Sequence, residues 1–268
     1  MTPAFRILSM GWGVQTWALA AMMALREIPL VDYLVFADTG HEGHGTYEFR
    51  AQWEPWLLEH GLRVVTVRAD NTDVVREDWG NGAVMIPAFT VAHRDGAAGQ
   101  VGRQCTHDWK ITPIRHFVRA ELKARGLSPT PGIVESQMGI SLDEWSRMRN
   151  SDVAYITNSY PLVDRRIKRA DCIQWLQQHV LPVPPKSACT FCPYKSRAAW
   201  QETKRTSGHD WDESVAVDNA IRDKRPVHGL LYIHSMRKPL AQAVAIPEDV
   251  GASQLSFDDV CDSGICGV

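Results

Sequence analysis

The segment Val31–Ala37 is an almost continuous apolar run, which is typical of a strand buried on both faces of a sheet. Helical patterns at Thr16–Arg26 and Tyr47–His60 lie on either side of it, and strand-like segments at Phe5–Met10 and Arg63–Arg68 lie beyond them. Strand–helix–strand units joined by right-handed crossovers build parallel sheets with helices on both faces. The sequence therefore predicts an α/β fold with an open, mostly parallel, twisted sheet.

The alternation continues with a helix at Asp108–Arg125, a fourth strand at Ile133–Ile140 and a short helix at Leu142–Arg149. Before these, the Gly-rich segment Gly80–Gly102 has little periodicity, so it predicts a long surface loop. The second half is less regular, with helical patterns at Ala170–Val180, Arg197–Thr206 and Asp212–Arg222 and a strand-like segment at Leu230–His234. We expect an α/β domain over residues 1–165, a smaller irregular cysteine-containing part over 166–246 packed on it, and a flexible cysteine-containing tail over 247–268.

The composition places few limits on function. No stretch reaches the run of about 20 apolar residues that spans a bilayer. The N-terminus has no basic segment followed by an apolar one, so we expect a cytoplasmic protein with no membrane partner. The net charge of −2 gives no support for a large nucleic-acid footprint. A local cluster of Arg165, Arg166, Lys168 and Arg169 is either a solvated turn before a helix, which is the simpler interpretation, or a basic patch.

The segment Ser9-Met10-Gly11-Trp12-Gly13-Val14-Gln15-Thr16 joins the first strand to the first helix. In an open α/β sheet, ligands bind outside the carboxyl ends of the strands, near a helix N-terminus. The two glycines let backbone amides approach an anion, and the helix start supplies oriented N–H groups, while Ser9 and Thr16 add hydroxyl donors. A Gly-containing turn that binds no phosphate has the same local pattern, so spacing alone leaves both interpretations open.

These eight residues resemble the PP-loop of N-type ATP pyrophosphatases and phosphoadenosine-phosphosulfate (PAPS) reductases, whose usual form is Ser-Phe-Ser-Gly-Gly-Lys-Asp-Ser. Ser9, Gly13 and Thr16 match in kind, whereas the Lys and Asp of the family are absent. The resemblance implies an adenine nucleotide alpha-hydrolase-like fold that binds ATP (or PAPS) with Mg²⁺. The residues that it places at the phosphates are Ser9, Gly11, Gly13, Gln15 and Thr16.

Two segments extend the resemblance in the order that the superfamily shows. Phe36-Ala37-Asp38-Thr39-Gly40, followed by Thr46-Tyr47, is similar to the Asp-Thr-Gly…Glu-Thr-Tyr segment of PAPS reductases. This similarity implies that Asp38 and Thr39 lie beside the nucleotide. Gly139-Ile140-Ser141-Leu142-Asp143-Glu144-Trp145-Ser146-Arg147 resembles Gly-x-Arg-x-x-Glu-Ser-x-x-Arg, with Ser141 in place of the first Arg. Arg147 or Arg149 is therefore expected to bind a phosphate, and Arg147 is the candidate that we take for the site.

Cysteines carry the second half of the resemblance. The segment Cys189-Thr190-Phe191-Cys192-Pro193 is a CxxC motif, which chelates one metal ion or one edge of a cluster. The segment from Arg103 to Ile114 resembles Cys-Cys-x-x-x-Lys-x-x-Pro-Leu; it keeps Cys105 and Lys110 but has Thr106 in place of the second Cys. The family places this segment beside the CxxC motif, which implies a [4Fe–4S] cluster held by three cysteines with one open iron. Lys110 is expected to offset charge on a phosphate.

Alternatives remain for the other cysteines and for the metal. Cys172 is a candidate fourth ligand, although an ordinary buried cysteine is the simpler interpretation. A structural zinc site of the Cys₃His type, with His107, competes with the cluster. PAPS reductases carry a reactive cysteine on a mobile C-terminal tail, and Cys261 and Cys266 are candidates for such a catalytic role or are incidental thiols.

Three functions follow from the resemblance. The first is ATP-dependent sulfur transfer (thiolation), in which an acceptor is adenylated and sulfur from a donor displaces AMP; the acceptor is tRNA, DNA or a small molecule. The second is the reduction of a sulfonucleotide such as PAPS by Cys261 or Cys266 with a thioredoxin-like reductant. The third is a nucleotide-binding module without enzymatic activity. We favour the first, because Thr106 removes one of the paired cluster cysteines and so leaves an iron open.

Overall fold

The computed structural model describes residues 2–79, 82–92, 94–224 and 229–245. Its centre is a five-stranded parallel sheet in the order β3-β2-β1-β8-β9. The strands are β1 (Phe5–Ser9), β2 (Tyr33–Ala37), β3 (Val64–Val67), β8 (Val134–Met138) and β9 (Ile156–Ser159). The first four were predicted from their apolar patterns; β9 was not, since Thr157, Asn158 and Ser159 make this edge strand largely polar.

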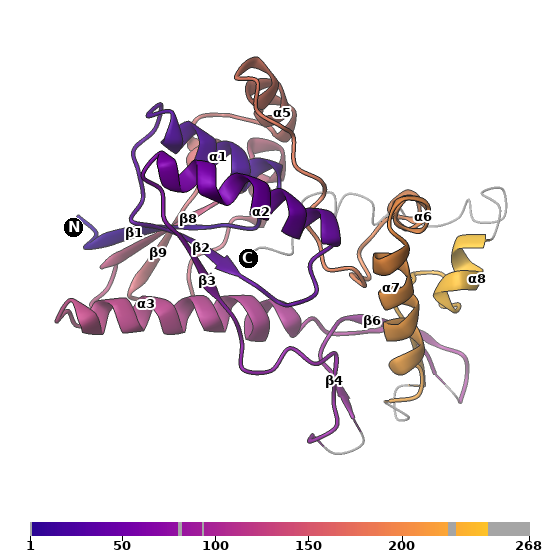
Figure 1. Ribbon diagram of the computed structural model, residues 1–268. Helices are drawn as coiled ribbons and strands as arrows, with labels where there is room; N and C mark the ends of the chain where they lie inside the picture. The colour runs from indigo at the N-terminus through magenta and orange to yellow at the C-terminus, as the bar shows by residue number, and fades with distance from the viewer. Residues whose placement is uncertain (1, 80–81, 93, 225–228, 246–268) are drawn as a thin grey trace.

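Helices cover both faces of this sheet, as the alternation predicted (Figure 1). On one face lie α1 (Val14–Ala24), α2 (His44–Glu59) and α5 (Arg169–Gln178); on the other lies α3 (Thr112–Ala124). Side chains of β1 alternate accordingly: Phe5 and Ile7 belong to the core cluster with α3, and Leu8 belongs to the cluster with α1. The open α/β fold is therefore confirmed.

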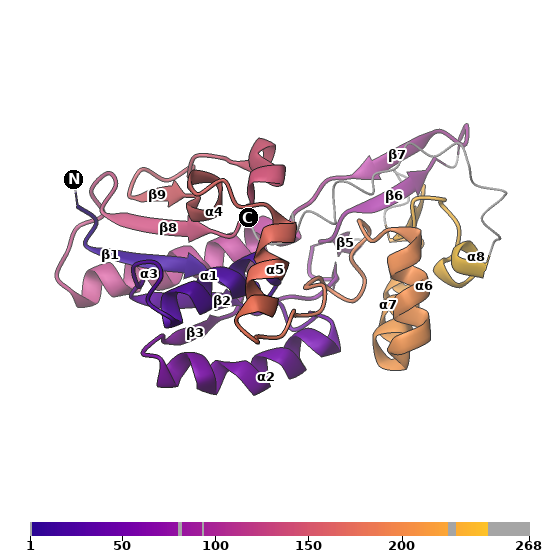
Figure 2. The same ribbon diagram turned by 90° about the horizontal axis from the view of Figure 1, so that it is seen from above.

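A second core lies beside the sheet (Figure 2). It combines an antiparallel sheet, ordered β10-β6-β7, with three helices. These elements are β6 (Ala88–Val91), β7 (Ala98–Val101), β10 (Leu230–Tyr232), α6 (Arg197–Thr206), α7 (Gly208–Ala220) and α8 (Leu240–Ala245). Because β6 pairs with β10 across a long sequence separation, this core takes residues from both predicted parts, 1–165 and 166–246. The predicted third part, the tail over 247–268, lies outside the described residues.

The prediction of a long surface loop at Gly80–Gly102 is wrong for the described residues of that segment. Val84, Met85, Ile86 and Ala88 are buried in the second core. The segment contains β5 (Ala83–Val84), which pairs with β4 (Val75–Arg76), and the β6–β7 hairpin. These strands are too short to show periodicity, and their pairing partners stabilise them instead.

Shorter elements complete the described chain: a π-helix, η1 (Thr106–Ile111), which runs into α3; a 3₁₀ helix, η2 (Leu142–Arg147); and α4 (Pro161–Asp164). Within the described ranges, no helix combines the length and the apolar character required to cross a bilayer.

Candidate functional site

The Gly-containing loop lies where the strand order reverses. In the sheet, β2 and then β3 lie on one side of β1, whereas β8 and then β9, which come later in the chain, lie on the other side of β1. Ser9 ends β1 and pairs with Val35 of β2 and Met138 of β8. In open α/β sheets, the crevice at the carboxyl ends of the strands on either side of this reversal is the usual ligand site. The loop and the first turn of α1 follow the carboxyl end of β1, at the position where this general rule places a ligand.

The start of α1 has the features of an anion-binding helix end. Gly13 is its N-cap without a side-chain hydrogen bond, and the first turn contains no acidic residue, so the positive end of the helix dipole is not offset there. Gln15 is buried, and its Nε2 has no hydrogen-bond partner among the described residues. Thr16 Oγ1 accepts from the amide of Gly11 at 3.3 Å and donates to the carbonyl of Gly13 at 3.2 Å. A phosphate oxygen would satisfy the buried Gln15 amide.

Two neighbours fix the conformation of this loop. Trp12 adopts a φ of 58°, which is rare for a large side chain, and its fully buried indole packs against Trp17 and Phe49. Gly139, just beyond β8, lies so close to α1 that an added Cβ would be 2.5 Å from Thr16 Cγ2. The loop is thus held between the aromatic cluster under α1 and the end of β8.

Asp38 is held rigidly at the carboxyl end of β2. Its Oδ1 accepts from Tyr47 Oη at 2.7 Å and from the amide of Gly40 at 2.8 Å, and its Oδ2 accepts from Arg68 at 2.5 Å. Burial alone would raise the pKa of Asp38, but these three donors outweigh it and the pKa is lowered. Asp38 is therefore a fixed carboxylate just beyond the carboxyl end of β2.

Glu42 joins this strand end to the CxxC segment. It is 3% exposed, and its backbone forms an antiparallel bridge with Cys189. Its Oε1 accepts from Lys110 Nζ at 2.9 Å and lies 4.0 Å from Cys189 Sγ, while Thr39 Oγ1 lies 3.7 Å from the same sulfur. Its Oε2 is buried with no hydrogen-bond partner among the described residues. Lys110 thus lies beside a cysteine and a carboxylate, and not at the Gly-containing loop.

Cys105, Cys189 and Cys192 line one pocket. Cys189 and Cys192 are buried and Cys105 is half-buried. The pocket is completed by Thr39, Ile86, Pro87, Arg103, Thr106, Trp109, Lys110, Phe191, Pro193 and Tyr194. The three thiols come from two segments that the sequence separates by more than 80 residues, so the fold brings together the cysteines that the resemblance placed at one site. Thr39, predicted beside the nucleotide, lies at this pocket as well.

The CxxC segment is a tight double turn that also contacts the Gly-containing loop. The amide of Cys192 donates to the carbonyl of Cys189 at 3.1 Å, and the amide of Lys195 donates to the carbonyl of Cys192 at 3.1 Å. Two residues before the motif, the hydroxyl of Ser187 donates to the carbonyl of Gly11. The candidate nucleotide loop and the cysteine pocket are therefore adjacent parts of one site.

Lys195 brings a further positive charge to the cysteine segment. Burial lowers its pKa, which the nearby Cys192 and Asp210 partly offset. Its Nζ donates to the carbonyl of Thr190 at 2.6 Å. Lys110 and Lys195 are thus both basic side chains near the cysteine segment.

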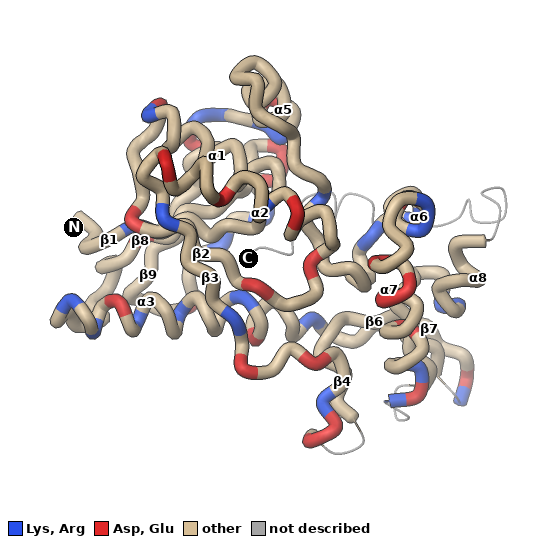
Figure 3. Tube along the Cα trace, viewed as in Figure 1, with Lys and Arg blue, Asp and Glu red and all other residues tan. Residues whose placement is uncertain are grey.

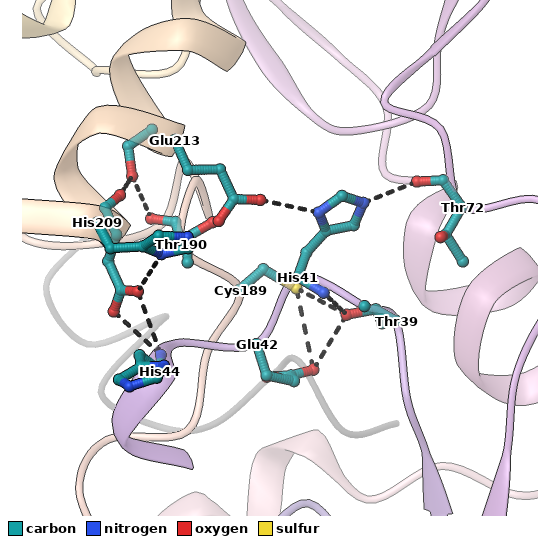
Figure 4. A network of polar contacts seen from close by, with 12 residues as sticks. Thr39, His41, Glu42, His44, Thr72, Cys189, Thr190, His209 and Glu213 are labelled. Atoms are coloured by element: carbon teal, nitrogen blue, oxygen red, sulfur yellow. Dashed lines mark hydrogen bonds and ion pairs between the residues drawn. The ribbon is translucent and has the colours of Figure 1, made fainter. Parts of the chain in front are cut away.

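His41 ties the pocket to α7 and to the segment after β3 (Figure 4). Its two ring nitrogens lie 3.0 Å from Glu213 Oε1 and 3.0 Å from the carbonyl of Thr72. Burial would lower the pKa of His41, but the interactions with Glu213 and the Thr72 carbonyl outweigh burial, so the pKa of His41 is raised. Burial would raise the pKa of Glu213, but the interactions with His41 and Thr190 outweigh burial, so the pKa of Glu213 is lowered. The ring also packs edge-on against Phe191, with centroids 4.9 Å apart. His41 is therefore a support of the cysteine pocket.

Several predicted site residues lie elsewhere. Cys172 is fully buried in the core between α1 and α5, away from the pocket, and burial raises its pKa to about 12. Arg147 pairs with the buried Glu144 at 2.7 Å. His107 is largely exposed and pairs with Asp108 at 2.7 Å, so it does not line the pocket. Cys261 and Cys266 are outside the described residues.

Within the part of the chain that the structure describes, no group of three or more His, Cys, Asp and Glu is arranged to hold a metal ion. The donor chemistry of the pocket nevertheless fits a thiolate-bound group, because three thiols and Lys110 line it. Glu42 and His41 were not predicted as site residues from the sequence. Both follow Asp38-Thr39-Gly40 directly at the carboxyl end of a predicted strand, and this position was the available signal.

A scan against protein-family models and a search of curated proteins both find no match to this chain. The structure and the site chemistry are therefore the basis for a functional proposal.

Proposed function

We propose that the protein is an ATP-dependent sulfur-transfer enzyme that adenylates its acceptor and carries a [4Fe–4S] cluster held by Cys105, Cys189 and Cys192. The observation that carries the proposal is that these three cysteines line one pocket next to a Gly-containing loop at the crevice of a parallel sheet. Cys105, Cys189 and Cys192 would hold the cluster, and the cluster would supply an iron able to bind the sulfur that is transferred.

The nucleotide would bind at the strand reversal. Amides of the loop and of the first turn of α1 would hold the phosphates with Mg²⁺, and Gln15 would donate its buried amide to a phosphate oxygen. Asp38, which is fixed by three donors, would lie beside the nucleoside. The residues proposed for phosphate binding are Ser9, Gly11, Gly13, Gln15 and Thr16.

The reaction has two displacements. In the first, an oxygen of the acceptor attacks the α-phosphorus of ATP, and pyrophosphate leaves. In the second, a sulfur nucleophile attacks the acceptor carbon that bears this oxygen, and AMP leaves with the electrons of the broken C–O bond. Lys110 is not at the phosphates, so we assign it to stabilising negative charge on the thiolates, with Glu42 fixing its ammonium group. Arg147 is assigned to holding η2 through Glu144.

The cluster is preferred to zinc because a Cys₃His site needs a fourth ligand at the pocket. His107, the nearest candidate in the sequence, is exposed and paired with Asp108. The uncapped start of α1 and the buried Gln15 amide suit a phosphate of ATP or of a sulfonucleotide alike. Adenylation is preferred to sulfonucleotide reduction because Thr106 stands in place of the second cysteine of the reductases' pair.

The test is a pair of assays on the anaerobically purified protein. With ATP, Mg²⁺ and candidate acceptors (tRNA, DNA or small molecules), we expect pyrophosphate release that depends on the acceptor, and we expect it to be lost in Gln15→Ala. With PAPS and a reduced thioredoxin-like protein, we expect no sulfite. Sulfite formation without ATP turnover would contradict the proposal and favour the reductase, whereas nucleotide binding without any turnover would favour a binding module.

A further inference from the structure

A polar cavity lies on the α1 side of the parallel sheet, over β1, β8 and β9. Its volume is about 410 Å³, which falls in the usual range of small-molecule sites. Arg6, Glu135, Gln137 and Ser159 line it from the sheet. Strands of a parallel sheet that is covered on both faces are normally apolar, so a polar cluster on one face is unusual. Among the described residues that line this cavity, none belongs to the Gly-containing loop or to the cysteine pocket.

The register of the strands brings these polar side chains together. Arg6 is the partner of Glu135 across β1 and β8, and Gln137 is the partner of Ser159 across β8 and β9. Glu135 accepts from Arg6 Nε at 2.9 Å, from Ser159 Oγ at 2.7 Å and from Gln137 Nε2 at 3.3 Å. Burial would raise the pKa of Glu135, but these hydrogen bonds outweigh burial, so the pKa of Glu135 is lowered. The cavity therefore contains a fixed carboxylate.

Gln137 leaves one polar atom unsatisfied beside this carboxylate. The residue is 9% exposed, and its Oε1 is buried without a hydrogen-bond partner among the described residues. Glu135 fixes the orientation of the amide, because turning it over would bring two acceptor oxygens together. A buried oxygen without a donor is costly, and an N–H group of a ligand would satisfy it.

The charges that line the cavity balance one another. Asp164 and Arg165 lie at the end of α4 and are both exposed. Arg165 donates to the carbonyl of Pro161 at 3.4 Å and forms no ion pair within the described ranges. With Arg6 and Glu135, the lining thus has guanidinium groups and carboxylates in equal number. Figure 3 likewise shows positive and negative residues interspersed along the elements around the sheet. A polyanion would meet both carboxylates and a simple cation both guanidinium groups, whereas a zwitterion suits the two signs together.

We propose that this cavity binds a free α-amino acid with an apolar side chain. The ammonium group of the ligand donates to Gln137 Oε1 and to Glu135 Oε2, and its carboxylate accepts from Arg165. The remaining lining is largely apolar and contacts the ligand side chain; it consists of Ile28, Pro29 and Pro161. The cavity is separate from the proposed nucleotide and cysteine site, so the inference does not depend on the proposed function.

The test is isothermal titration calorimetry of the full chain with L-leucine, without nucleotide or metal. We expect saturable binding with a Kd below about 1 mM. Leucinamide lacks the carboxylate and 4-methylpentanoate lacks the ammonium group, so each is expected to bind about tenfold more weakly or worse. Gln137→Met removes the unsatisfied acceptor at similar side-chain length, and R165Q removes the cation; each is expected to weaken leucine binding about tenfold. R166Q is the matched control, because Arg166 is exposed and is not among the residues that line the cavity, and we expect unchanged binding.

Urea denaturation of each variant ensures that binding is compared between folded proteins. Arg165 is exposed, so R165Q keeps the test valid if Gln137→Met does not fold. The inference would be overturned by an absence of leucine binding, by equal binding of leucine and 4-methylpentanoate, or by unchanged leucine binding in either folded variant. Binding of glucose in place of leucine would also overturn it and would assign the cavity to a neutral polyol.

Discussion

The contact between Gly139 and Thr16 provides the sharpest test of the loop geometry. A Cβ at position 139 would lie 2.5 Å from Thr16 Cγ2, 3.1 Å from its amide nitrogen and 3.3 Å from its Cα. Two of these atoms are backbone, so the start of α1 has to shift. Overpacking of this kind costs about 1–3 kcal/mol, and we expect Gly139→Ala to lower the free energy of unfolding by about 2 kcal/mol.

The assay is urea denaturation of three variants. Gly11→Ala is the matched control, because a Cβ there would meet no atom within 4 Å; we expect a change within about 0.5 kcal/mol. Thr16→Ser removes Cγ2 and keeps the hydroxyl, so G139A/T16S is expected to recover part of the loss while the backbone contacts remain. If Gly139→Ala is as stable as Gly11→Ala, the close approach of β8 to α1 is wrong.

Three further predictions follow from buried charged groups and thiols. Glu42→Ala removes a buried acceptor of Lys110, so we expect the free energy of unfolding in urea to fall by about 3 kcal/mol. A fall of less than about 1 kcal/mol would contradict a buried ion pair between Glu42 and Lys110. Burial lowers the pKa of His234 from 6.5 to about 4, so the folded state favours the neutral ring. This contribution to the free energy of unfolding is fully present above pH 6.5 and is lost as the pH falls towards 4, by about 3 kcal/mol in total. His234→Gln is expected to flatten the dependence of the unfolding free energy on pH, measured from denaturation curves over this range. An unchanged pH dependence would refute the prediction. Since burial raises the pKa of Cys172 to about 12, iodoacetamide at pH 8 (mapped by mass spectrometry) is expected to label Cys105 well before Cys172, and the reverse order would contradict their placement.

The central sheet was predictable because its strands are apolar and are separated by long helical patterns. Phe5–Met10 and Ile133–Ile140 were placed to within two residues at each end, as β1 and β8. In the second core, α6, α7 and β10 were predicted from their local patterns at Arg197–Thr206, Asp212–Arg222 and Leu230–His234. β6 and β7 were not predicted, since their pairing depends on β10, which lies far along the chain. Short strands that are stabilised by non-local pairing leave little trace in local periodicity.

The candidate site was predictable in part. The CxxC pair is visible in the sequence, but its meeting with Cys105 followed from the resemblance and not from spacing. Glu42 was missed because a glutamate after a strand is ordinarily solvated, and only the fold buries it against Lys110. For Cys172 the simpler interpretation, an ordinary buried cysteine, is confirmed by its burial between α1 and α5.

What the three pocket cysteines bind decides most directly whether the proposed function is correct. The measurement is anaerobic reconstitution with iron and sulfide, followed by iron and sulfide analysis and visible absorption, for the unaltered protein and for single Cys→Ser variants at 105, 189, 192 and 172. We predict a coloured protein with about four iron atoms per chain, a large loss of iron in Cys105→Ser, Cys189→Ser and Cys192→Ser, and no loss in Cys172→Ser. A colourless protein that retains zinc, or full iron content in Cys105→Ser, would contradict the account.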